Sequence, residues 1–490
     1  MKYGVILKFL SFITAITAGF MMIPLAVSSS TESGDASAFA ASIVIGLTVS
    51  VALYFLGWEA DMSFMGMTEI YASVTLSWIA ASAISALPYY IYGAAPTFAD
   101  AFFESMSGYT TTGGTIFPQI DILPHSILIW RAMTHWLGGM GIIGFTLAMM
   151  SFTGAAGYQI FSAESPGMTH DKMTPRIRQT AIYLWLIYAG LTVTLTLLLM
   201  LGGMNFFDSV NNSMATVSTG GFSTHTASIA YFHSSYMEWV IIIFMFLSGA
   251  NFVLHFYALK GRSLRHYFAD PEFRFYLISV SLLSLLISTD LFIGGLGSFF
   301  SSLRAAAFHV TSFVTTTGFV ANNYDLWPSL SKNILFICLF LGGCAGSTAG
   351  GMKHVRLLVM LHSVGRRLRQ MLNPKAVVIL PIGSSAQDPA VMSSCMAFFG
   401  LYLIVFIVGS FALSLYEPDL ITAITGAVST LGNVGPGFGY LGAVGNYSGQ
   451  SSEAKWICSF LMLCGRLELF TVFSLFSGIF RRGHRITISN

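Results

Sequence analysis

The sequence predicts an all-α polytopic membrane protein of ten transmembrane helices, built as four tandem helix, re-entrant loop, helix repeats after an N-terminal pair of helices. Three observations support this fold class. Of the 490 residues, 54% are hydrophobic and only 9% are charged, whereas roughly 25% are charged in an average soluble domain. Long apolar stretches recur from end to end, and one short polar motif occurs four times between paired stretches. A soluble fold is therefore excluded.

Ten apolar stretches are long enough to cross a membrane, because about 20 helical residues span a hydrocarbon core of about 30 Å. An outer-membrane barrel would instead show alternating strands of about ten residues. The first stretch is longer than the core of a secretion signal, so we interpret it as a membrane helix. The expected spans are residues 5–27, 39–57, 71–93, 124–150, 179–203, 236–258, 275–298, 332–362, 390–416 and 455–480.

The lysines and arginines are distributed unevenly among the loops, which predicts the orientation of the chain. If residue 1 is cytoplasmic, most of the 23 basic residues fall on that same side, and both termini are cytoplasmic. The loop at 58–70 departs from this pattern, with three acids and no Lys or Arg, but acids have little weight in the rule. The predicted inner basic residues are Lys2, Lys8, Lys172, Arg176, Arg178, Lys260, Arg262, Arg265, Arg274, Lys353, Arg356, Arg366, Arg367, Arg369, Lys375, Arg481, Arg482 and Arg485.

Net charge and cysteine content exclude two further classes. A formal charge of +2 does not favour nucleic acid as a partner. The five cysteines lie in or beside predicted spans without a Cys-x-x-Cys pair, so they indicate neither a disulfide framework nor a zinc site. We interpret them as small buried apolar side chains.

The polar motif is a Thr- and Gly-containing turn that occurs four times, each time between two predicted spans. Its key glycines, Gly113, Gly220, Gly318 and Gly435, stand 107, 98 and 117 residues apart. One copy would be interpreted as a helix end with a glycine cap, but four copies in the same order argue against that reading. The copies are Ser107–Gly114, Met214–Gly221, Ser312–Phe319 and Ser429–Pro436.

A short semi-apolar segment precedes each turn, at residues 99–110, 206–217, 303–315 and 419–431. These segments are too short to span a bilayer and are predicted to be re-entrant helices. Non-helical backbone at membrane depth survives only where protein shields it or where it lines water. Four such turns around one axis would form a pore mouth, because closely spaced carbonyl oxygens bind a partly dehydrated cation and glycine permits the required dihedral angles.

In these residues the sequence resembles the Trk/Ktr/HKT superfamily of potassium transporters, and within it the bacterial TrkH-type uptake subunits. Beyond the four turns, the resemblance rests on Arg131–Gly141, Gly342–Lys353, Gly432–Gly437 and Gly465–Glu468, and it covers nearly the whole chain. It implies pseudo-fourfold symmetry around one pore, a homodimer with a pore in each protomer, and a location in the bacterial inner membrane. The transported ion is implied to be K+.

The resemblance also implies a selectivity filter lined by the glycine of each turn. In the family, glycine in all four turns goes with K+ selectivity, while serine in the first goes with Na+. The second and fourth turns lack the three threonines of the others, so we expect an imperfectly symmetric ring. The implied ion-binding residues are Thr110, Thr111, Thr112, Gly113, Val217, Ser218, Thr219, Gly220, Thr315, Thr316, Thr317, Gly318, Gly432, Asn433, Val434 and Gly435.

The stretch 342–351 interrupts the eighth predicted span with five glycines and two alanines, a composition that does not hold a helix alone. We expect a break there that faces a water-filled cavity, and the resemblance implies an intramembrane gate. Close helix packing by small residues is the alternative. A phosphate-binding loop is excluded, because Met352 separates Gly351 from Lys353. The implied gate residues are Gly343, Gly346, Ser347, Thr348, Gly350, Gly351 and Lys353.

Arg466 lies within the last span, where a charged residue is expected to be functional. The resemblance implies that it projects beneath the filter as an electrostatic barrier. Pairing with Glu468 is not expected, since residues two apart on a helix do not face each other. Arg131 and His135 are interpreted either as anchors of neighbouring loops or as part of the ion path, and His309 as a hydrogen-bonding residue of its own short helix.

The resemblance implies a cytosolic nucleotide-binding regulatory subunit of the TrkA type, with any nucleotide bound by that partner. The segment 366–369 offers either this partner or membrane lipid a basic surface. A sodium-coupled or sodium-permeable carrier on the same fold is the alternative function. An intramembrane enzyme is not expected, because neither paired aspartates nor a His-Glu-x-x-His motif is present.

Taken along the chain, the repeats predict five divisions. They are a two-helix extension at 1–66 and pore repeats at 67–170, 171–265, 266–375 and 376–490, of which the third contains the glycine-rich break.

Overall fold

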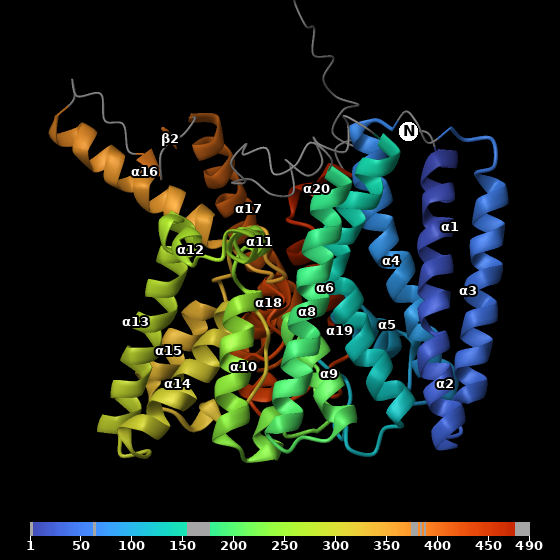
Figure 1. Ribbon diagram of the computed structural model, residues 1–490, viewed down its shortest axis with the longest axis horizontal. Helices are drawn as coiled ribbons and strands as arrows, with labels where there is room; N and C mark the ends of the chain where they lie inside the picture. The colour runs from blue at the N-terminus through green and yellow to red at the C-terminus, as the bar shows by residue number, and fades with distance from the viewer. Residues whose placement is uncertain are drawn as a thin grey trace, which may run out of the picture.

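The computed structural model describes residues 3–61, 65–153, 177–373, 381–382, 385–386 and 389–475. In these ranges the protein is a bundle of upright helices with shorter helices packed inside it (Figure 1). An all-α fold is confirmed, apart from one antiparallel pair of two-residue strands, β1 (Pro381–Ile382) and β2 (Ser385–Ala386). The predicted boundaries at 170 and 375 lie outside the described ranges. So do the basic residues Lys2, Lys172, Arg176, Lys375, Arg481, Arg482 and Arg485.

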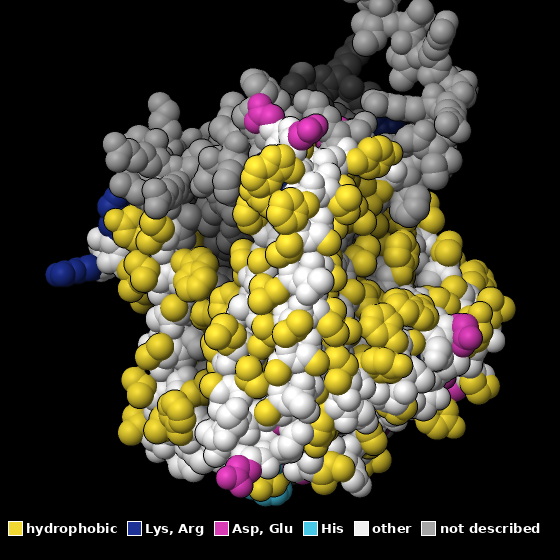
Figure 2. All heavy atoms as spheres, turned by 90° about the vertical axis from the view of Figure 1, so that its right-hand side faces the viewer, with side chains coloured by type: hydrophobic (Ala, Val, Ile, Leu, Met, Phe, Trp, Pro, Cys, Tyr) yellow, Lys and Arg dark blue, Asp and Glu magenta, His cyan; other side chains and the backbone are white. Residues whose placement is uncertain are grey.

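Long apolar helices form the outside of the bundle. Six of the described helical segments are long and apolar enough to cross a membrane, and a bent pair, α10 with α11, gives a seventh. Figure 2 shows the face over α1 and α3, where apolar side chains cover most of the surface. Ile16, Val44, Val51 and Phe55 are exposed there, as expected of a surface in contact with lipid rather than water. The helices that make up the predicted spans are α1 (Tyr3–Phe20), α2 (Met22–Thr31), α3 (Ala36–Leu56), α4 (Met67–Tyr92), α6 (His125–Thr153), α8 (Ile177–Leu201), α10 (Ser235–Ser248), α11 (Phe252–Gly261), α13 (Pro271–Ile293), α15 (Ser329–Cys338), α16 (His354–Leu372), α17 (Pro389–Ser414), α19 (Ser452–Arg466) and α20 (Phe470–Ser474).

Three predicted spans are interrupted. The span predicted at 236–258 bends by 99° between α10 and α11. The span at 332–362 is α15, an irregular segment and α16, so the predicted break at 342–351 is present. The span at 455–480 breaks after α19, where Glu468 and Leu469 both have positive φ. Leucine rarely adopts such a backbone.

The four predicted re-entrant helices are present as α5 (Phe98–Tyr109), α9 (Phe206–Val217), α14 (Phe299–Val314) and α18 (Leu420–Gly432). Each begins at a residue whose side-chain oxygen accepts the N–H three residues later, an N-cap that fixes where the helix starts. The capping residues are Thr97, Asn205, Ser298 and Asp419.

The short helices lie in the interior of the bundle. Nearly every residue of α5 and α9 is buried, and the largest apolar cluster packs α4, α5, α6, α18 and α19 together. The remaining short elements lie in connections: α12 (Arg265–Ala269) and the 3-10 turns η1 (Ser228–Phe232), η2 (Tyr324–Leu326) and η3 (Gly439–Leu441). The C-terminal ends of the four re-entrant helices therefore point into the protein rather than into lipid.

Candidate functional site

The four re-entrant helices end in the same turn. We call the turns loops 1 to 4, at residues 110–114, 218–222, 315–319 and 432–436. In each, the first residue with positive φ is a threonine or asparagine (51 to 56°), and a glycine two positions later has a φ of 78 to 97°. The N–H between them donates to the helix carbonyl five residues earlier, at 2.8 to 2.9 Å. The turns are thus a helix cap of the Schellman type followed by a second left-handed residue.

This geometry corrects the register of loop 2. The repeated motif aligned Gly220 with Gly113, but the left-handed glycine of loop 2 is Gly221. Gly220 occupies the position of Thr112, and Val217 corresponds to Tyr109, the last residue of α5. The error arose because two successive glycines follow Thr219, and the letters alone do not say which one is left-handed. The equivalent glycines, called the ring glycines, are Gly113, Gly221, Gly318 and Gly435.

The loops close into a ring in chain order. A Cβ added to any ring glycine would overlap a backbone carbonyl oxygen of the adjacent loop, and the carbonyl always belongs to the equivalent residue. Loop 4 meets loop 1, so the ring is complete. Glycine is needed at these positions both for its φ and for this close approach. The pairs are Gly113 with Gly220, Gly221 with Thr317, Gly318 with Val434, and Gly435 with Thr112.

A buried ion pair ties loops 1 and 2 together from behind. The guanidinium of Arg131 in α6 lies 2.7 Å from the carboxylate of Glu104 in α5, and both side chains are buried. Arg131 also donates to the Ser223 carbonyl at 3.1 Å and to the Thr115 hydroxyl at 3.2 Å. The Glu104 carboxylate accepts the Ile116 N–H at 2.9 Å. Arg131 is therefore an anchor of the neighbouring loops.

His135 makes the same connection one helical turn later. Its Nδ1 donates to the Gly108 carbonyl at 2.7 Å, and its Nε2 accepts the Phe222 N–H at 3.1 Å. The neutral imidazole with its proton on Nδ1 satisfies both bonds. His309 bonds to the Ala305 carbonyl of its own helix at 2.9 Å, as predicted.

Loops 3 and 4 are tied to their neighbours by tyrosines. The Tyr324 hydroxyl donates to the Gly437 carbonyl at 2.8 Å. The Tyr447 hydroxyl donates to the Gly435 carbonyl at 2.7 Å, and its backbone N–H donates to the Thr115 carbonyl at 2.8 Å. Hydrogen bonds from outside the ring thus hold loop 4 and connect the segments that follow loops 3 and 4 to their neighbours.

The irregular segment 342–351, called the glycine loop, lies directly against loops 2, 3 and 4. Its Gly350 N–H donates to the Thr316 hydroxyl at 2.7 Å. The Thr348 hydroxyl lies 3.1 Å from the Val217 carbonyl and 3.3 Å from the Thr219 hydroxyl. A Cβ on Gly350 would lie 2.8 Å from the Gly432 carbonyl. The glycine loop therefore covers the inner side of the ring.

Glu272 fixes both ends of the glycine loop. Its Oε1 accepts the Ala345 N–H at 2.8 Å and the Val355 N–H at 2.9 Å. The loop is further attached to the break between α10 and α11, where Cys344 N–H donates to the Gly249 carbonyl at 2.8 Å and Phe252 N–H to the Gly346 carbonyl at 3.1 Å. Nothing in the sequence motif identified Glu272.

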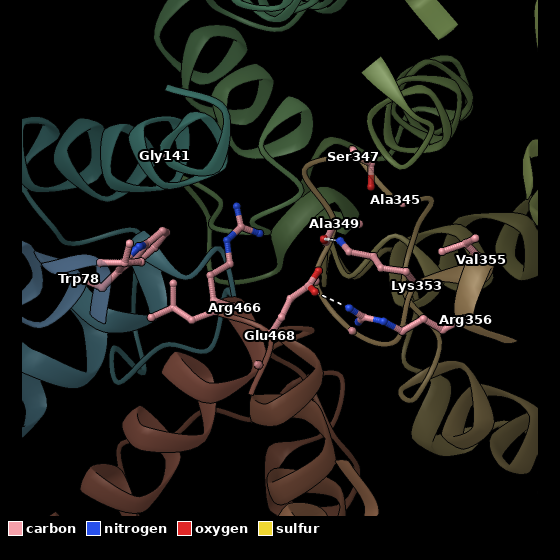
Figure 3. Close-up of a pocket in the computed structure, with 16 residues that line it drawn as sticks. Trp78, Gly141, Ala345, Ser347, Ala349, Lys353, Val355, Arg356, Arg466 and Glu468 are labelled. Atoms are coloured by element: carbon pink, nitrogen blue, oxygen red, sulfur yellow. Dashed lines mark hydrogen bonds and ion pairs between the residues drawn. The ribbon is translucent and has the colours of Figure 1, made fainter. Parts of the chain in front are cut away.

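Arg466 holds the glycine loop from below. Its guanidinium donates to the Thr348 carbonyl at 2.7 Å and to the Gly138 carbonyl of α6 at 3.0 Å. Glu468 pairs with Arg356 at the start of α16, so it does not neutralise Arg466, as predicted. Lys353 donates to the Ala349 carbonyl. Figure 3 shows these charged side chains around a cavity of about 50 Å³, enough for a few water molecules.

Comparisons with known proteins show the family of the chain. The sequence matches the model of one protein family, described as TrkH, cation transport protein, over residues 35–483. The chain belongs to the TrkH family. This family consists of transport proteins, so the expectation that the chain is not an enzyme is confirmed.

Individual TrkH-family relatives match along their whole length. The chain is 38% identical over 487 residues to the Trk system potassium uptake protein TrkH of Escherichia coli K12, covering 98% of this chain and all of the relative. It is 32% identical to the Trk system potassium uptake protein TrkI of Halomonas elongata, covering 98% and 97%. The crystal structure of the potassium transporter TrkH from Vibrio parahaemolyticus superposes with a TM-score of 0.88 at 32% identity, covering 98% and 100%.

Proposed function

We propose that the chain takes up K+ across the bacterial inner membrane through loops 1 to 4, which act as the selectivity filter. The observation that carries this proposal is the ring of four equivalent turns, in which each ring glycine lies against a backbone carbonyl oxygen of the adjacent loop. Carbonyl oxygens brought together in this way replace part of the hydration shell of a cation. The names of the curated relatives support K+ as that cation.

Unpaired oxygens at the inner end of the ring support the same role. Thr111, Thr219, Thr316 and Asn433 occupy equivalent positions there. The hydroxyls of Thr219 and Thr316 bond to the glycine loop. Thr111 Oγ1 and Asn433 Oδ1 are buried and have no hydrogen-bond partner among the described residues. A partly dehydrated K+ would satisfy such buried acceptors, which are otherwise unfavourable.

The glycine loop is the gate in this proposal. It lies against the inner end of the ring, and Arg466 contributes an electrostatic barrier at the same place. At about 5 Å and an effective dielectric constant near 20, the charge of Arg466 raises the energy of K+ by about 3 kcal/mol, or about a hundredfold in occupancy. Conduction therefore requires the glycine loop and Arg466 to move together.

The orientation follows from the positions of the basic residues. Lys260, Arg262 and Arg265 lie around α11 and α12, and Arg367 and Arg369 on α16, all at the end of the bundle that holds the N-terminus (Figure 1). The positive-inside rule then makes that end cytoplasmic. The ring opens toward the other side, because Gly113, Gly221 and Gly318 are partly exposed while the threonines beneath them are buried.

The same end of the molecule offers a docking surface. Helix α16 leaves the bundle at an angle and carries Arg366, Arg367 and Arg369 (Figure 1). We propose that a cytosolic nucleotide-binding subunit of the TrkA type docks on this helix. We also propose that the complete protein is a homodimer. Both proposals rest on family resemblance. Through the Arg356–Glu468 pair, α16 is connected to the segment that carries Arg466.

Rubidium uptake into proteoliposomes that hold the purified chain tests the proposal. Potassium in excess should compete with rubidium, sodium should not, and a pH gradient should leave the flux unchanged. Equal competition by sodium would overturn the potassium assignment and favour a sodium-permeable carrier. The ring gives a specific reason to test this alternative, because Gly220 and Val434 stand where loops 1 and 3 have threonine.

A further inference from the structure

A long groove lies between α8 and α11, away from the ring. Its volume is about 930 Å³, and α11 flanks the upper part of α8 (Figure 1). The groove exists because α11 bends by 99° away from α10 and no longer packs along the bundle axis. His255 fixes this bend by donating from Nε2 to the Leu247 carbonyl at 3.0 Å.

The two ends of the groove differ in chemistry. Along α8 its wall is apolar, with Leu186 61% exposed and Gly190 open. At its cytoplasmic end Lys260 and Arg262 are exposed, and neither has an acidic partner among the residues that the structure describes. The lining residues include no Asp or Glu. An apolar channel that ends in two unpaired cations matches the shape and charge of an anionic phospholipid.

We propose that this groove binds an anionic phospholipid, with its headgroup phosphate at Lys260 and Arg262 and an acyl chain along α8, and that the lipid steadies α11. The inference rests on the orientation given under Proposed function, which puts Lys260 at the cytoplasmic surface. Helix α11 begins at Phe252, whose N–H holds the Gly346 carbonyl of the glycine loop. The lipid therefore stabilises the conformation in which the glycine loop covers the ring.

Binding is tested without any transport measurement. A tryptophan placed in the groove by Leu186→Trp is reconstituted in vesicles that contain brominated phosphatidylglycerol or brominated phosphatidylcholine, and the quenching of the eight native tryptophans is subtracted using the unmodified chain. Each basic side chain should raise the affinity for the anionic lipid about fivefold. Half-maximal quenching should therefore need roughly 25-fold less phosphatidylglycerol than phosphatidylcholine. The matched control is Met396→Trp on α17, which replaces a side chain that is 46% exposed, and it should show no preference.

Removing the charges identifies the headgroup site. Adding Lys260→Gln and Arg262→Gln to the reporter should bring the preference close to one, whereas Arg274→Gln on α13, an exposed charge outside the groove, should leave it intact. Equal quenching by the two lipids in the Leu186→Trp chain that retains Lys260 and Arg262 would overturn the proposal, since bulk lipid would then fill the groove. Absence of quenching by either lipid would also overturn it, because a protein surface would then cover Leu186.

Flux then tests the effect on α11. In vesicles with phosphatidylglycerol, the Lys260→Gln/Arg262→Gln chain should pass rubidium at least about twofold faster than the Arg274→Gln chain. Gly190→Phe, which fills the groove from a position with no atom within 4 Å of its Cβ, should have the same effect as charge removal, and Gly400→Phe, equally open, should not. Equal flux in all four chains would overturn the stabilisation of α11.

Discussion

The ring of loops 1 to 4 and the glycine loop beneath it are built on opposite principles. The ring repeats one turn four times, each copy is closed by the same neutral backbone hydrogen bond, and a buried ion pair lies behind loops 1 and 2. The glycine loop occurs in the third repeat alone, and unlike contacts from several other elements hold it, among them those of Glu272, Gly249, Thr316 and Arg466. The difference teaches that the two parts have different roles. The repeated turns fix the geometry of the ring, whereas the unlike contacts of the glycine loop can be released.

The largest expected effect is at the ring. Gly221→Ala combines a left-handed backbone with overlap of the Thr317 carbonyl, so rubidium uptake should fall to background. Gly203→Ala is the matched control, because its φ is also positive (94°) but its Cβ meets no atom within 4 Å. It should cost about 1 kcal/mol of stability and leave uptake intact. Uptake retained in Gly221→Ala would refute the corrected register of loop 2.

The next effect is on the contacts of the glycine loop. Arg466→Gln removes the charge beneath the ring and keeps a hydrogen-bond donor, so rubidium flux should rise by up to about a hundredfold. Arg274→Gln removes an exposed charge on α13 and serves as the control. Flux is measured in proteoliposomes without any partner protein. If both variants conduct alike, Arg466 is a structural residue and not a barrier.

A smaller increase is expected at Glu272. Glu272→Ala leaves the N–H groups of Ala345 and Val355 without their acceptor, and each such loss costs about 1 to 3 kcal/mol. Hydrogen exchange of residues 342–355 should accelerate, and basal flux should rise severalfold. Glu272→Gln retains an acceptor oxygen and should behave much like the unmodified chain. Slow exchange in the alanine variant would show that the other anchors suffice.

The smallest effect is on the outer surface, where Asp121 links loops of repeats 1 and 2. Burial raises the pKa of the Asp121 carboxyl, but hydrogen bonds from Thr226 and His225 outweigh burial and lower the pKa below its ordinary 3.8. Its stabilisation is therefore present above pH 3.8 and is lost as the pH falls through the lower folded value. Asp121→Asn should lower Tm by about 1 °C at pH 7, and the difference should shrink steadily below pH 3.8. A difference that grows on acidification would contradict this assignment.

Much of the fold follows from local sequence. Helices α5, α9 and α18 start and end within two residues of the predicted segments, because caps such as Thr97 and Asp419 and the Gly-containing turns are local signals. Helix α14 begins earlier, at Phe299, where Ser298 caps it. The break at 342–351 could also be predicted from the local sequence, since its glycine-rich composition disfavours a helix.

What sequence reasoning missed depends on contacts between distant residues. The predicted span at 236–258 gave no sign of the 99° bend, which the glycine loop stabilises from about 95 residues away through Gly249. The Glu104–Arg131 pair and the role of Glu272 likewise require the packed structure. Loop 2 is the instructive case, because Thr219-Gly220-Gly221 permits two registers and only contact with Thr317 selects one.

Closure of the ring has a consequence for how the protein is made. Loop 1 is completed at Gly114, yet its partner contact with Gly435 lies more than 300 residues further along the chain. While the ribosome is still inserting the earlier repeats, three loops leave a gap on one side and no ring exists. A chain that terminates prematurely before loop 4 therefore never acquires the finished ring, and under the proposed function such a chain has no selectivity filter.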